Sequence, residues 1–159
     1  MRLFAGVAAR DPERRTDRQA LVAMAARVRA ADPHVLVRDR IGLLVAGVEH
    51  PGTAQPGMTI GGDVDVTNAG EVCEIGGADQ VLDALGALYR REGAAALRRL
   101  RGAFALAIWD EARAELVLAV DQLGIGRLYV AERPDAILFA TRVGALVGPG
   151  GVAGEADPA

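Results

Sequence analysis

The sequence has 159 residues, a formal net charge of -3 and a sequence pI near 5.4. A chain of this length can bury roughly 70% of its unfolded surface in one domain, and its acidic balance argues against a broad, basic nucleic-acid-binding face. Its one cysteine excludes an internal disulfide, and no apolar run reaches the roughly 20 residues of a spanning helix, so we expect a cytoplasmic protein without a membrane partner.

The first third of the chain predicts a strand, a helix and two further strands. Residues 2–8 are apolar enough for a strand. A helix is expected to start at Thr16, because Thr16 and Gln19 fit a capping box, and to end at Asp32–Pro33. Residues 35–48 predict two strands separated by a charged turn.

The middle of the chain predicts a second helix after a glycine-rich segment. Residues 58–66 suggest two short strands around a tight turn at Gly61–Gly62, and residues 68–77 a loop or strand edge. Asp79 is the expected N-cap of a helix that ends at Gly93, where glycine is typical of a helix stop. Another helical turn or two should follow in residues 94–101.

The last third predicts a meander of four strands with turn-rich links, at residues 103–109, 115–120, 128–132 and 136–140. Residues 148–159 are rich in glycine and proline and are expected to form a flexible tail or linker after one domain, residues 1–147. Short antiparallel strands with two helices predict an α+β fold.

Three motifs in this region occur together at characteristic separations. They are LRGAFALAIWD (residues 100–110), LAVDQLGIGRLY (residues 118–129) and FATRVGALV (residues 139–147), and Gln55–Pro56 and the helix end before Gly93 add to them. Together they closely resemble the N-terminal glutamine amidotransferase domain of asparagine synthetases. The resemblance covers residues 55–159 well and residues 1–54 weakly. It implies the four-layer αββα sandwich of N-terminal nucleophile hydrolases.

The resemblance also implies a catalytic position that this sequence does not fill. In the family, a cysteine directly after the initiator Met attacks the glutamine side-chain amide, with its own α-amino group as base. Arg2 stands there in this chain, and a guanidinium stays protonated and cannot attack a carbonyl. The bulk of Arg2 also makes removal of Met1 unexpected.

The family's substrate-binding positions match only in part. Its Asn-Gly-Glu falls on Ala69, Gly70 and Glu71, so Gly70 and Glu71 are the candidate substrate-binding residues, while the oxyanion donor is lost. Asn68 stands one place earlier, where a one-residue shift along a strand would point it to the opposite face.

Two further anchors look substituted as well. The family's ammonium-binding Asp falls on Val81, with Asp79 as an alternative placement, and its anchoring Arg falls on Leu43, with Arg40 nearby. Four substitutions together indicate that the domain no longer hydrolyses glutamine. We expect position 2 to face a filled site, or one lined by apolar groups such as Leu43 and Val81.

No other residue offers an obvious replacement for this chemistry. Cys73 is internal and lacks a free α-amino partner, so we interpret it as a packing residue. His34, His50 and Cys73 do not have the spacing of a metal site.

We therefore expect no catalytic residue, metal or cofactor in this chain. The sequence predicts a silent glutaminase-like pseudoenzyme domain that acts as a structural platform for an ATP-dependent, amide-forming ligase of the asparagine synthase type. The chain stops where the family's synthetase half would begin, so a truncated product, an N-terminal piece and a separate subunit all remain open. ATP and Mg²⁺ would bind the partner chain or domain.

Two alternatives also remain open. One is an active glutamine amidotransferase that supplies ammonia for asparagine biosynthesis, with a start elsewhere or a moved nucleophile. The other is an interaction module with no link to ligases. The sequence fixes neither the partner's substrate nor the oligomeric state.

Overall fold

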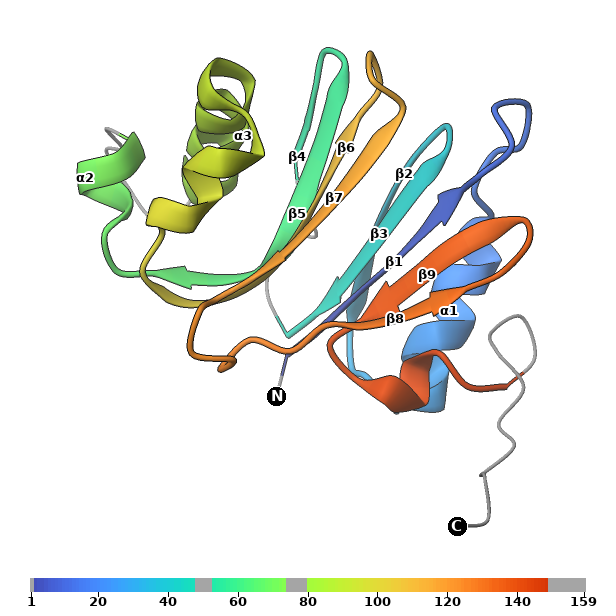
Figure 1. Ribbon diagram of the computed structural model, residues 1–159. Helices are drawn as coiled ribbons and strands as arrows, with labels where there is room; N and C mark the ends of the chain where they lie inside the picture. Colours follow the sequence, from blue (N-terminus) through green and yellow to red (C-terminus); the bar gives the residue numbers. More distant parts are fainter. Residues whose placement is uncertain (1, 48–52, 74–79, 149–159) are drawn as a thin grey trace, which may run out of the picture. The chain divides into compact units, whose positions relative to one another are not determined.

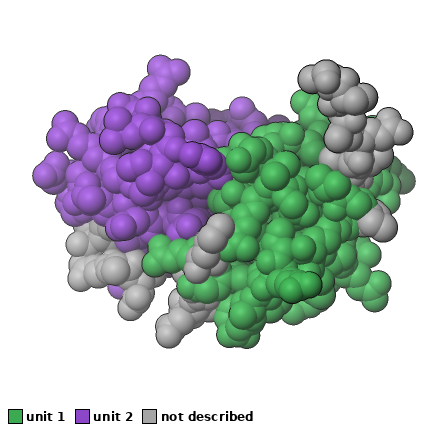
Figure 2. Space-filling model, turned by 90° about the horizontal axis from the view of Figure 1, so that it is seen from below, with its two compact units in different colours: residues 1–49, 128–159 green, residues 50–127 purple. Residues whose placement is uncertain are grey.

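A computed structural model describes residues 2–47, 53–73 and 80–148 of the chain (Figure 1). The chain divides into two compact units, which are described separately. Unit 1 comprises residues 1–49 and 128–159, and unit 2 comprises residues 50–127 (Figure 2).

Unit 1 is built around a five-stranded sheet in the order β2-β3-β1-β9-β8, and every neighbouring pair is antiparallel. Its elements are β1 (Leu3–Ala9), α1 (Arg18–Arg27), β2 (Pro33–Arg38), β3 (Ile41–Ala46), β8 (Tyr129–Glu132), β9 (Ala136–Ala140) and the 3₁₀ turn η3 (Val143–Ala145). In β1, Gly6 lies opposite Leu43 on one side and Phe139 on the other. A Cβ atom at Gly6 would come within 2.1 Å of the Phe139 ring, so only glycine fits there.

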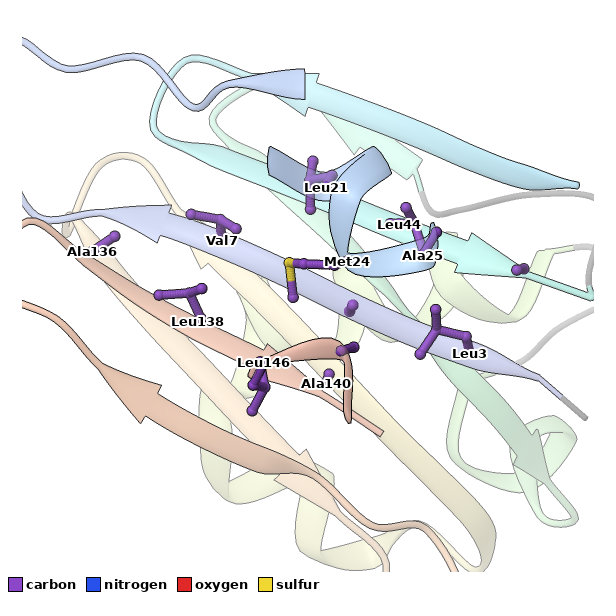
Figure 3. Close-up of a cluster of buried hydrophobic side chains, with 13 residues drawn as sticks. Leu3, Val7, Leu21, Met24, Ala25, Leu44, Ala136, Leu138, Ala140 and Leu146 are labelled. Carbon is purple, nitrogen blue, oxygen red and sulfur yellow. The ribbon is translucent and has the colours of Figure 1, made fainter. Parts of the chain in front are cut away.

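The core of unit 1 follows from the two-residue period of β1. Leu3, Ala5 and Val7 share one face of the sheet, where they join a cluster with Leu21 and Met24 of α1 (Figure 3). Leu21 and Met24 are spaced by one helical turn, so the helix presents both to the sheet. Burial of alternate strand residues against a helix stripe is what holds α1 on this face.

Unit 2 contains a four-stranded antiparallel sheet in the order β4-β5-β6-β7. Its elements are β4 (Thr53–Gln55), β5 (Met58–Val66), α2 (Ala69–Cys73), α3 (Val81–Glu92), the 3₁₀ segment η2 (Ala94–Arg99), β6 (Gly102–Asp110) and β7 (Glu115–Val120). Leu85, Leu88 and Tyr89 of α3 pack with Ile60 and Leu106 of the sheet. The predicted helix stop is confirmed at Gly93, which has a φ of 72°.

Several sequence predictions are confirmed by these elements. The four C-terminal strands lie within a residue of their expected bounds, and the strand pair around residues 38–40 is β2 and β3. The predicted α+β class with antiparallel sheets is therefore confirmed. In the described residues, no helix combines the length and the apolar character that crossing a membrane requires.

The prediction for the start of α1 was wrong by one residue. Asp17, not Thr16, caps the helix, and its carboxylate accepts the Gln19 N–H at 2.8 Å. Thr16 still belongs to the preceding loop, because its N–H donates to the Asp39 carbonyl at 2.8 Å. The helix also ends earlier than expected, at Arg27.

The predicted turn at Gly61–Gly62 was also wrong. β5 runs unbroken through both glycines, which pair with Ala107 and Leu106 of β6. A Cβ atom at Gly62 would lie 2.5 Å from the Ala105 carbonyl oxygen, so glycine here permits a close strand approach and not a turn.

The segment expected to be a loop or strand edge begins with a short helix, α2. Asp79, the predicted N-cap of α3, lies outside the described residues, as do residues 149–159 of the predicted tail. His50 lies outside them too. The residue that precedes α3 is Gln80, whose side chain makes no capping hydrogen bond.

Candidate functional site

The first residue of the candidate site, Arg2, immediately precedes the central strand of the unit 1 sheet. The start of β1 is held by Thr141, whose hydroxyl accepts the Phe4 N–H at 3.0 Å and whose own N–H donates to the Phe4 carbonyl at 2.8 Å. Strand pairing to β3 and β9 on both sides fixes this end further. The Arg2 side chain is exposed. The position that the resemblance assigns to the nucleophile therefore carries a protonated guanidinium, which has no lone pair available for attack.

A separate set of candidate residues, in unit 2, lies in the short helix α2 and in the turn before it. Gly70 and Glu71 lie in α2, and both are exposed. Ala69, in the position of the oxyanion donor, is buried and has only a methyl side chain. Neither matched residue supplies a side-chain donor suited to a developing oxyanion.

Asn68 is engaged elsewhere and does not replace that donor. Its side-chain Nδ2 donates to the Arg99 carbonyl at 2.9 Å, and its Oδ1 accepts the Arg101 N–H at 2.8 Å. Both ends of the amide thus bind the segment between η2 and β6. This arrangement ties two turns of unit 2 together, and the amide cannot leave it without breaking both hydrogen bonds.

Arg40 does not replace the missing substrate-anchoring arginine. Its guanidinium donates to the Ala9 carbonyl from Nε at 3.1 Å and to the Arg10 carbonyl from a terminal nitrogen at 2.7 Å. These carbonyls lie at the far end of β1 from Arg2, roughly 25 Å away at the rise of an extended strand. Leu43, in the anchor position, is fully buried opposite Gly6.

The positions near the start of α3 are also occupied by structural contacts. Val81 is the first residue of the helix and packs at the edge of the unit 2 core. Asp83 accepts a hydrogen bond from Gln55 Nε2 at 3.0 Å, and Arg90 donates to Gln55 Oε1. Gln55 of the Gln-Pro loop thus ties β4 to α3. The expected lining of a site by Leu43 and Val81 draws on both units and stays a prediction.

One structural residue was missed by the sequence reasoning, although its signal is in the sequence. Asp121 is 5% exposed, and its carboxylate accepts the N–H groups of Leu123, Ile125 and Gly126 at 3.0, 3.0 and 2.5 Å. Phe104 N–H donates to the same carboxylate at 3.3 Å. Backbone hydrogen bonds lower the pKa of Asp121, and the one from the Gly126 N–H has the largest effect. Burial acts in the opposite direction but is outweighed. Asp side chains commonly accept a backbone N–H two residues further on, so an Asp shortly before two glycines is a signal of such a loop.

The described residues hold no group of three or more His, Cys, Asp and Glu side chains placed to bind a metal ion. Cys73 is the last residue of α2, and its side chain lies outside the described part of the structure. Its interpretation as a packing residue stays a prediction.

Comparison with known proteins identifies the class to which this scaffold is similar. The fold matches glutamine phosphoribosylpyrophosphate (PRPP) amidotransferase from B. subtilis with a TM-score of 0.65 and 16% sequence identity, over 92% of this chain and 43% of that chain. At this identity the match shows the fold alone, and it agrees with the predicted α+β class with antiparallel sheets.

A family model matches part of the sequence. Residues 76–148 match the family described as glutamine amidotransferase domain. The amidase chry2 of Gibberella zeae is 40% identical over 57 residues, which are 36% of this chain and 8% of the amidase. The predicted resemblance to glutamine amidotransferase domains is therefore confirmed. The chain spans less than half the length of either matched protein.

Proposed function

We propose that this chain is a glutamine amidotransferase domain that has lost glutamine hydrolysis and serves as a platform for an amide-forming partner. On this proposal residues 1–147 act as one domain, which keeps the fold of an amidotransferase domain without its hydrolytic activity. The observation that carries the proposal is Arg2 at the start of β1, where the resemblance requires a cysteine. Hydrolysis would need a nucleophile there that is deprotonated near neutral pH, and arginine cannot supply it.

The engagement of Asn68 supports the same conclusion independently. A hydrolytic site must present an N–H donor to the oxyanion of the tetrahedral intermediate, and loss of one such donor typically costs about two to three orders of magnitude in rate. The Ala69 side chain has no donor, and the Asn68 side-chain amide is held by the backbone at Arg99 and Arg101. Restoring the nucleophile alone would therefore leave the site without its electrostatic support.

The platform role rests on the size of the matched proteins. This chain corresponds to 43% of the amidotransferase chain and 8% of the amidase, so in both proteins the matched region belongs to a longer polypeptide. We propose that the partner of this domain is an ATP-dependent ligase chain or domain of the asparagine synthase type. ATP and Mg²⁺ would then bind the partner, and this chain would need no cofactor of its own.

The competing function is an active glutaminase that uses Cys73. Cys73 ends a five-residue helix and is an internal residue, so it has no α-amino group of its own to act as the base. Release of ammonia from glutamine by the purified chain distinguishes the two functions. We expect no release above the level of a Cys73→Ala variant, whereas turnover that the Cys73→Ala change abolishes would refute the silent domain.

A further inference from the structure

A cavity of about 230 Å³ lies in unit 1, at the amino end of α1. Its apolar lining comes from β1 and β9, where Val7, Ala136 and Leu138 lie together on the helix-facing side of the sheet (Figure 3). Its polar lining comes from the loop before α1 and the turn before β9. The residues of that polar lining are Arg14, Arg15, Thr16, Asp17, Arg133 and Asp135.

The two carboxylates of the cavity already have partners within the protein. Asp17 caps α1 through the Gln19 N–H. Asp135 pairs with Arg14 at 2.7 Å and with Arg133 at 3.1 Å. Burial alone would raise the pKa of Asp135, but its own backbone N–H and these two cations lower it on balance, so the carboxylate remains charged.

Arg15 is the charged residue of the lining that is available to a ligand. It is exposed at the cavity, and within residues 2–47, 53–73 and 80–148 it has no ion-pair or hydrogen-bond partner. Three guanidinium groups against two carboxylates leave the lining with one net positive charge. The first turn of α1 contains no acidic residue, so only the capping Asp17 carboxylate, already counted above, offsets the positive end of the helix dipole.

One polar group beside the cavity also lacks a partner. Thr16 is 8% exposed, and its hydroxyl has no hydrogen-bond partner within the described ranges. A buried hydroxyl normally finds one, in protein, water or ligand. Together with Arg15 and the helix end, this hydroxyl makes the polar side of the cavity suited to an oxygen-bearing anion.

We propose that this cavity binds a small organic carboxylate. The carboxylate would face Arg15 and the amino end of α1, and a short apolar body would lie on Val7, Ala136 and Leu138. A planar guanidinium pairs well with a carboxylate through two parallel hydrogen bonds. The volume is below the usual range for ligand pockets, roughly 300–1,000 Å³, so the ligand must be small. The site is independent of the proposed function.

Butyrate is a suitable probe, because it combines a carboxylate with a short apolar chain. Titration of the ¹⁵N-labelled full chain should give saturable amide shifts in residues 15–20 and 135–136. The Arg15→Gln variant should weaken binding by about tenfold, the loss expected for one charge-assisted contact. Arg29→Gln is the matched control, since Arg29 is an exposed arginine just beyond the opposite end of α1. It should bind as the unmodified chain does.

Two further experiments test whether the negative charge and the apolar body of butyrate are both recognised. Butylammonium, with the same body and the opposite charge, should not bind. Ala20→Leu, which narrows the cavity from the helix side, should weaken butyrate binding without loss of fold. The proposal is overturned by shifts that do not saturate, by equal losses in the Arg15 and Arg29 variants, or by inorganic phosphate binding as tightly as butyrate and unaffected by Ala20→Leu.

Discussion

Replacement of Asn68 by alanine tests whether this amide is a structural bridge. The change removes two hydrogen bonds, from Nδ2 to the Arg99 carbonyl at 2.9 Å and from the Arg101 N–H to Oδ1 at 2.8 Å. A neutral hydrogen bond contributes about 0.5–1.5 kcal/mol net, and these groups are exposed enough for water to replace part of the loss. We expect the free energy of unfolding to fall by about 1–2 kcal/mol.

Urea unfolding followed by circular dichroism measures this change, which should appear as a lower midpoint with an unchanged slope. In a chain of this size it corresponds to a melting temperature lower by about 2–8 °C. Thr67→Val is the matched control in the same turn, because it removes only a 3.3 Å bond to the Arg101 carbonyl. An Asn68→Ala variant as stable as the unmodified chain would refute the bridge and leave the amide free for an oxyanion.

Two further changes test the described loops and strands. Because backbone donors lower the pKa of Asp121, its stabilising contribution is present above the unfolded pKa near 3.8 and is lost as the pH falls through the lower folded value. Asp121→Asn should therefore lower the urea midpoint at pH 7. As the pH falls, the midpoint of this variant should decrease less steeply than that of the unmodified chain, and equal slopes in acid would contradict this. Gly62→Ala should destabilise the chain by about 1–3 kcal/mol in urea unfolding, because its Cβ would meet the Ala105 carbonyl at 2.5 Å. At Gly70 a new methyl would have no neighbour within 4 Å among the described residues, apart from the adjoining residues and the backbone of its own helix. Gly70→Ala should therefore change stability by no more than about 1 kcal/mol, and similar losses in both variants would refute the close-packing argument.

Much of the fold could be predicted because its signals are local. The strands of residues 102–140 alternate or carry turn residues at their ends, and Gly93 ends α3 through a left-handed φ. Gly61–Gly62 was misread because glycine has two uses in strands. Turn formation is visible locally, whereas close approach to a neighbouring strand depends on which strand pairs with it.

The candidate site, like the fold, could be predicted from the sequence only in part. Through the resemblance, the identities of Arg2 and Ala69 predict that two groups expected in the family are missing. The sequence could not show that Asn68 binds backbone 31 and 33 residues further on, or that Arg40 serves the far end of β1. Both facts depend on tertiary contacts that no local spacing encodes. Asp121 is the intermediate case, because its glycines mark a loop but not the number of N–H groups that the carboxylate accepts.

The proposed loss of glutamine chemistry is tested most directly by intact-mass measurement after incubation with an electrophilic glutamine analogue. An amidotransferase nucleophile forms a covalent adduct with such a reagent, and excess glutamine protects it. We predict that the chain gains no glutamine-protected adduct at any residue. A single adduct that maps to Cys73 and disappears with excess glutamine would contradict the account.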